Sequence, residues 1–203
     1  MRRSGRLMSS QNKLYLDGCS FTYGVGLDNK DKLSTLLTQE AGFAVTNNAR
    51  PGKSNLAIAL DIHRNANAHD VIIAGWTFSD RFYLESRDLQ LDFLPTRPIA
   101  HINDDVIGEQ LEEAYNIIHK QLYTIHDNHF YDDLSDMLIN GIYSDLRRQG
   151  KKVIFFSWEN RNTSMDMFYP IIEPGLRLDD GHLNKKGMQK LYEDITWLYE
   201  KTK

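Results

Sequence analysis

Cysteine is nearly absent from this sequence, in which Cys19 is the single thiol among 203 residues. One cysteine excludes an internal disulfide framework and a zinc site built mainly of thiolates. Long apolar runs are missing as well, because residues 71–76 and 153–156 fall far short of the roughly 18 residues that a membrane span requires. We therefore expect no membrane association.

Basic residues are in deficit, with 24 Lys and Arg against 28 Asp and Glu and a formal net charge of −4. A chain of this sign lacks the basic field that binds phosphate backbones without sequence preference, so we expect no nucleic-acid partner. Residues 1–12 carry arginines but no apolar core of an export signal, which predicts a flexible tail and a cytoplasmic location, with a phage source left open.

Four short runs rich in Val, Ile, Leu and Phe predict strands buried on both faces, at residues 14–17, 43–46, 71–74 and 152–156. Apolar runs without alternation are typical of a parallel sheet that helices cover on both sides. This pattern predicts an α/β fold, a three-layer α/β/α sandwich. Residues 13–203 are expected to form one domain with an enlarged helical crossover at about 104–150.

The segments between and after these strands carry apolar residues at helical spacing. This spacing predicts helices over residues 33–41, 56–63, 106–125, 134–146 and 188–199. Ser54 and Asn184 are expected to cap the second and the last of them. In the second helix, Leu56, Ala59, Leu60 and His63 share a face that is expected to be buried. Residues 77–105 and 159–180 lack regular periodicity and are predicted as loops.

Hydroxyl, amide and glycine residues follow each predicted strand, where open α/β sheets bind their ligands. Ser20 comes directly after the first strand and could act as a nucleophile. His182, before the last helix, could serve as its base, and Asp179, three residues earlier, could orient that base. Asp180 competes for this carboxylate role, and position favours Asp179. The backbone N–H groups of Ser20 and Gly52 are candidate donors to an oxyanion.

Four of these segments resemble blocks I, II, III and V of the SGNH (GDSL-like) hydrolases, in the same order. The segments are Gly18-Cys19-Ser20, the loop around Gly52, the segment from Gly75, and 179–182. The resemblance implies a flavodoxin-like three-layer fold and a Ser/His/Asp triad that hydrolyses acyl or acetyl esters without a cofactor or metal. It assigns Ser20 as nucleophile, His182 as base, Asp179 as its partner and Gly52 as an oxyanion donor.

The sequence departs from the family pattern at two positions. Cys19 replaces the usual Asp of block I, where no chemistry is expected. Thr77 stands where block III has an Asn whose amide serves the oxyanion hole, so a shorter hydroxyl takes that place. Asn48, Asn55 and Asn160 are alternative amide donors. The segment Gly75-Trp76-Thr77 is similar to the block III segment of SGNH-like proteins from phages and environmental bacteria.

Side chains of the strand-end loops are candidates for substrate binding, although each could also be a core or loop-fixing residue. The candidates are Tyr23, Trp76, Phe78, Arg81, Trp158 and Asn160. The expected substrate is a small-molecule or glycan ester, with acetyl on carbohydrate favoured. An acyltransferase with the same triad and a catalytically impaired binding module are the alternatives. A metal site from His126, Asp127, His129 and Asp132 is rejected, because no further ligand has suitable spacing.

Overall fold

The computed structural model describes residues 11–85, 89–93, 98–102, 116–118, 120–121, 128–161, 163, 165, 167–170 and 173–201. Its central feature is a parallel four-stranded sheet with the order β2-β1-β3-β7. The strands are β1 (Lys13–Gly18), β2 (Ala44–Asn47), β3 (Val71–Trp76) and β7 (Lys152–Ser157). All four predicted strands are confirmed to within a few residues at their ends. The order sets the carboxyl end of β1 between those of β2 and β3.

Burial of β2 differs from the prediction. β1 and β3 are buried along almost their whole length, whereas β2 is exposed at three of its four residues. The reason is its place at the edge of the described sheet, where it pairs with β1 alone. The apolar run that contains Phe43 and Val45 therefore predicted the strand but not its position within the sheet.

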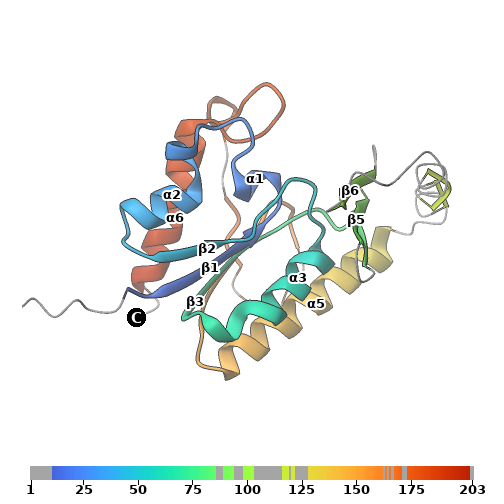
Figure 1. Ribbon diagram of the computed structural model, residues 1–203, viewed down its shortest axis with the longest axis horizontal. Helices are drawn as coiled ribbons and strands as arrows, with labels where there is room; N and C mark the ends of the chain where they lie inside the picture. Colours follow the sequence, from blue (N-terminus) through green and yellow to red (C-terminus); the bar gives the residue numbers. More distant parts are fainter. Residues whose placement is uncertain are drawn as a thin grey trace, which may run out of the picture.

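Helices cover both faces of the sheet (Figure 1). α2 (Leu33–Gln39) and α6 (Lys185–Lys201) pack together on one face, and α3 (Asn55–Asn65) and α5 (Asn128–Arg148) pack together on the other. The three-layer α/β/α sandwich is thereby confirmed. Other helical segments are α1 (Ser20–Tyr23), the short 3₁₀ turns Asn29–Asp31, Ala66–Ala68 and Pro174–Leu176, and the helical residues 116–118 and 120–121.

Both predicted N-caps are confirmed. The Ser54 hydroxyl accepts from the Ala57 N–H at 3.3 Å, and the Asn184 side chain accepts from the Gly187 N–H at 3.1 Å. The predicted inner face of α3 is confirmed only at Ala59, because the helix buries Ile58 and Ile62 while Leu56 and His63 are exposed. Apolar residues occupy more than one face of α3, so helical spacing alone cannot select the inner one.

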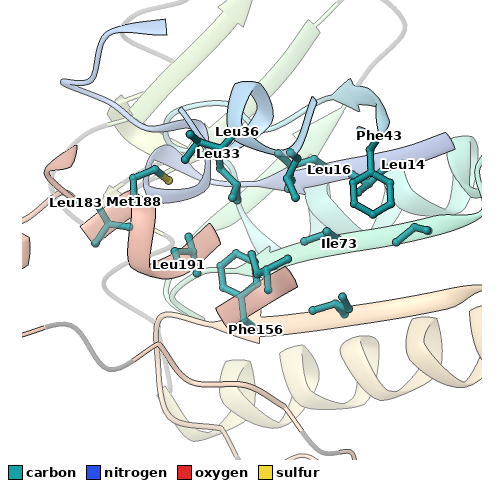
Figure 2. Packing of buried hydrophobic residues seen from close by; sticks show 14 residues of the cluster. Leu14, Leu16, Leu33, Leu36, Phe43, Ile73, Phe156, Leu183, Met188 and Leu191 are labelled. Atoms are coloured by element: carbon teal, nitrogen blue, oxygen red, sulfur yellow. The ribbon is translucent and has the colours of Figure 1, made fainter. Parts of the chain in front are cut away.

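The core on the α2/α6 face is an apolar layer between strands and helices (Figure 2). Leu14 and Leu16 of β1 and Ile73 of β3 meet α2 and α6 there. The helices contribute leucines, one methionine and one isoleucine, namely Leu33, Leu36, Leu37, Met188, Leu191 and Ile195. This continuous contact fixes α6, and with it the segment just before α6 that contains His182.

The stretch 77–105, predicted as a loop, contains a second sheet. Strands β4 (Phe82–Glu85), β5 (Leu89–Phe93) and β6 (Pro98–Ile102) pair in antiparallel order. β4 packs against α3. The prediction failed because each strand is short and because β4 and β5 carry charged residues, although Leu-Gln-Leu-Asp-Phe in β5 does alternate with the period of a strand.

Of the predicted crossover at about 104–150, the structure describes residues 116–118, 120–121 and 128–150. α5 begins at Asn128, six residues before the predicted start of that helix, and packs against α3 and β7. The predicted helix over 106–125 lies largely outside the described residues, as do residues 1–10, His126 and Asp127. Within the described chain, every helix is too short or too polar to cross a bilayer.

Candidate active site

Ser20 is the first residue of α1 and lies directly beyond the end of β1. Gly18 pairs with Gly75 of β3 in the sheet, and a Cβ at either glycine would lie within 2.3 Å of the Thr22 hydroxyl oxygen. The absence of two side chains thus lets α1 pack against the strand ends. Ser20 keeps 8% of its surface exposed, and its hydroxyl has no hydrogen-bond partner among the described residues.

His182 lies beside this turn, although it is far from it in sequence. Its ring packs against that of Phe21, the residue after Ser20, with 4.8 Å between centroids. No hydrogen bond joins the imidazole to the Ser20 hydroxyl in the described structure. Catalytic hydrogen bonds are often long or misaligned before substrate binds, so this arrangement is compatible with the expected roles of Ser20 and His182, and it brings the His182 ring to the residue next to Ser20.

The carboxylate against His182 is that of Asp180. Its Oδ2 lies 3.0 Å from Nδ1 of the ring, and its Oδ1 accepts from the His182 backbone N–H at 3.1 Å. The contact with the ring is an ion-pair contact that is not aligned as a hydrogen bond. The nearby His182 ring and the His182 backbone N–H lower the pKa of the exposed Asp180 carboxyl. The predicted partner, Asp179, is exposed and stays a prediction.

The Gly52 loop approaches from the adjacent strand end. The backbone N–H of Arg50 donates to the Gly18 carbonyl at 3.1 Å, which joins this loop to the nucleophile turn. Gly52 is buried with φ of 79°, a conformation that favours glycine. Among the described residues, no acceptor takes the N–H of Gly52 or of Ser20. Both groups are therefore free to donate to an oxyanion.

None of the three asparagines predicted as alternative amide donors has a free amide buried beside Ser20 in the described structure. The Asn55 amide bonds both backbone groups of Thr77, at 2.8 and 3.0 Å, and Asn48 donates to buried carboxylates. Asn160 is exposed. The Thr77 hydroxyl is buried and has no partner among the described residues, so a substrate could reach it only if neighbouring groups move.

Aromatic rings gather beside Ser20. Phe21 stacks on Trp158 at 5.0 Å between centroids and meets the edge of Phe78 at 6.4 Å. Arg81 lies over Phe78, 5.3 Å from its centroid, and donates to the Lys53 carbonyl at 3.4 Å. These contacts bring together three predicted substrate residues.

Two other predicted substrate residues lie elsewhere. Trp76 has no exposed surface and packs on Phe155 in the core of the α3/α5 face, where a substrate has no access. Tyr23 packs under the ammonium of Lys32, 4.1 Å from the ring centroid. Sequence reasoning missed Phe21, although its place directly after Ser20 was the available signal.

Sequence reasoning also missed a buried ion network beneath the Gly52 loop. Lys53, with no exposed side-chain surface, lies 2.5 Å from Asp17 Oδ1 and 2.7 Å from Asp61 Oδ2. Arg50 pairs with Asp61 at 3.4 Å and with Asp92 of β5 at 3.1 Å. An aspartate at the end of the apolar strand β1 was a signal, because buried charges require partners.

Burial raises the pKa of Asp17 to about 6, and the Lys53 ammonium opposes that rise. The folded pKa thus exceeds the ordinary value, so the contribution of Asp17 to stability is present below about pH 4 and is lost as the pH rises through about 6. Lys53 limits this loss by holding the carboxylate in its charged form.

Sequence comparison gives no matching family model and no matching curated protein. Comparison of structures does give matches. TesA has a TM-score of 0.54 at 11% identity, over 91% of this chain and 96% of that chain. The psychrotrophic esterase EstA from Pseudoalteromonas sp., in a structure inhibited by monoethylphosphonate, has a TM-score of 0.53 at 10% identity, over 93% and 100%.

A third similar structure is the acetyl xylan esterase Est2A from the rumen bacterium Butyrivibrio proteoclasticus. Its TM-score is 0.50 at 11% identity, over 94% of this chain and 64% of that chain. At such low identity the likeness concerns the fold. Together with the strand order, it shows that this chain shares the three-layer α/β/α fold of these three structures.

Proposed function

We propose that this protein is a serine hydrolase that cleaves small acyl esters, with acetyl on a carbohydrate as the favoured substrate. Ser20 is the nucleophile and His182 the general base. The observation that carries the proposal is the position of the His182 ring, packed on the residue next to Ser20 with a carboxylate 3.0 Å from Nδ1. This contact at Nδ1 leaves Nε2 to take the serine proton.

In the proposed reaction, Ser20 Oγ attacks the ester carbonyl carbon while its proton passes to His182 Nε2. The N–H groups of Ser20 and Gly52 donate to the oxyanion. Collapse of the intermediate breaks the ester bond, and the departing alcohol takes the proton from His182. Water, deprotonated by the same imidazole, then hydrolyses the acyl-enzyme and releases the acid. The aromatic rings of Phe21, Phe78 and Trp158 offer apolar faces of the kind that sugar rings or acyl chains contact.

The experiment that tests this function is hydrolysis of 4-nitrophenyl acetate, butyrate and octanoate by the purified protein. We expect saturable release of 4-nitrophenolate, fastest with the acetyl ester. Release that does not exceed the spontaneous rate, from protein whose far-UV circular dichroism shows a folded α/β domain, would contradict the proposal.

Transfer of the acyl group to an acceptor other than water would use the same residues, and a direct experiment distinguishes it from hydrolysis. Added glycerol or xylose would increase 4-nitrophenolate release and yield an acetylated acceptor if transfer competes with water. A constant rate without such a product identifies water as the acceptor.

A second candidate function, an SGNH-like binding module with impaired catalysis, is favoured by the state of the Thr77 segment. The block III amide is missing, the Asn55 amide is engaged by the Thr77 backbone, and the Thr77 hydroxyl is buried. Loss of one oxyanion donor costs about 10²–10³ in kcat. A substitution Thr77→Asn that raises kcat would show that the native site is short of a donor.

We expect Asp180→Asn to lower kcat by about 10²–10⁴ and Asp179→Asn to change it less than threefold, because Asp180 is the carboxylate beside the His182 ring. Both aspartates are exposed neighbours, so each variant is the matched control of the other. The comparison is made with 4-nitrophenyl acetate at pH 8. The opposite ranking would assign the orienting role to Asp179, as the sequence spacing predicts.

A further inference from the structure

The buried ammonium of Lys53 lies among three oxygen atoms. Its Nζ lies 2.5 Å from Asp17 Oδ1, 2.7 Å from Asp61 Oδ2 and 3.2 Å from the Asn48 carbonyl oxygen. It donates hydrogen bonds to Asp17 and to the Asn48 carbonyl, and its contact with Asp61 is an ion pair. Displacement of a buried charge from such partners is costly, because it leaves charged and polar groups unpaired.

The position of Lys53 in the chain gives this geometry its significance. Lys53 directly follows Gly52, whose N–H faces no acceptor in the described structure. Asp17 precedes the turn that begins at Gly18 and leads to Ser20, and its Oδ1 also accepts from the Gly18 N–H at 2.7 Å. One ion pair therefore connects the segment with the proposed oxyanion donor to the segment with the proposed nucleophile.

Gly52 is held from both sides. Before it, the Arg50 N–H donates to the Gly18 carbonyl at 3.1 Å. After it, the Lys53 side chain reaches Asp17, and the Ser54 N–H donates to Asp92 at 2.9 Å. The flexible point of the loop is thus the turn of Pro51 and Gly52, and Lys53 limits how far that turn can move relative to β1.

We propose that Lys53 is a positioning residue, whose ion pair with Asp17 sets the Gly52 N–H at the distance from Ser20 that the oxyanion requires. The proposal rests on the proposed function for its catalytic consequence. Its structural part, the fixed Gly52 loop, stands independently of that function. Lys53 itself does not touch substrate, because its side chain has no exposed surface.

The test compares Lys53→Met with the double variant Asp17→Asn/Lys53→Met. The single variant leaves buried carboxylates without their ammonium and is expected to lower stability as well as activity. In the double variant, the Asn still offers an oxygen to the Gly18 N–H and one buried charge is gone, so we expect much of the stability to return. The matched control is Lys151→Met, which removes an ammonium bonded to the His69 carbonyl at 2.6 Å, near the opposite end of the sheet.

The first readout is amide hydrogen exchange, which needs no enzymatic activity. At a temperature well below the unfolding midpoint, we expect exchange at the hydrogen-bonded amides on either side of Gly52, those of Arg50 and Ser54, to be at least about tenfold faster in the double variant than in the wild type, with amides of α6 unchanged. Unchanged exchange at both amides would overturn the proposal, whatever the wild-type protein does with esters. Equal acceleration throughout the domain would also overturn it, because it indicates general loss of stability.

The second readout is the split between kcat and KM for 4-nitrophenyl acetate. A displaced oxyanion donor is expected to lower kcat by about 10²-fold with little change in KM, since the donor acts on the transition state. A stable double variant with wild-type kcat would limit Lys53 to a purely structural role. If the wild type hydrolyses no ester, the proposed function fails, and hydrogen exchange still decides whether Lys53 fixes the Gly52 loop.

Discussion

Replacement of Ser20 by alanine is expected to lower kcat for 4-nitrophenyl acetate by about 10⁴–10⁶-fold, because it removes the atom that forms the acyl-enzyme. Ser20 is mostly buried, and its hydroxyl has no partner in the described structure. Its loss thus breaks no described hydrogen bond and leaves no buried polar group unpaired. Stability should change by less than about 1 kcal/mol, so the kinetic effect can be assigned to chemistry.

Ser34→Ala is a suitable control for this substitution. Ser34 lies in α2 and is partly exposed, and its backbone carbonyl, which the substitution keeps, accepts from Thr38. We expect wild-type kcat for this variant. A Ser20→Ala protein that retains more than a tenth of the wild-type kcat would mean that another residue performs the attack.

Gly75→Ala is expected to lower the free energy of unfolding by about 1–3 kcal/mol, and by more if the atoms that surround the new methyl group cannot move away. A Cβ at this position would lie 2.2 Å from the Thr22 hydroxyl oxygen and 2.6 Å from Cζ of Phe156. Phe156 is completely buried in the apolar layer of the α2/α6 face, so its ring has little room to move. The added methyl must therefore displace α1 or the ring.

Urea denaturation, followed by tryptophan fluorescence, measures this effect. Gly141→Ala is the matched control, because Gly141 lies within α5 and a Cβ there would meet nothing within 4 Å. That substitution is expected to stabilise the protein by about 0.5–1 kcal/mol, since alanine is the better helix former. Equal midpoints for Gly75→Ala and the wild type would show that the close packing around Gly75 contributes no constraint.

The central sheet could be predicted from sequence because β1, β3 and β7 consist of apolar runs whose pattern reflects burial on both faces. The β4–β6 sheet could not. Its strands mix charged and apolar residues, and Asp92 of β5 is buried only because Arg50 and the Ser54 N–H lie opposite it. Such burial depends on distant partners, which no local pattern indicates.

The site residues also divide into those that a local sequence pattern predicts and those whose positions depend on distant partners or turn geometry. Ser20 and His182 were predicted to be neighbours because the carboxyl ends of parallel strands share one edge of a sheet. The choice between Asp179 and Asp180 depends on turn geometry, and here Gly181 has φ of 86°, which folds the chain so that Asp180 contacts His182. The ion pair of Lys53 with Asp17 joins residues 36 positions apart, so sequence spacing could not reveal it.

Covalent labelling with a fluorophosphonate probe tests the central claim most directly. An activated serine displaces fluoride and forms a stable phosphonyl ester, which tandem mass spectrometry can locate on one peptide. The account predicts one label per chain at Ser20, no label in Ser20→Ala, and slower labelling in a His182→Ala variant. A label on any other residue, or labelling that persists in Ser20→Ala, would contradict the assignment of Ser20 as the nucleophile.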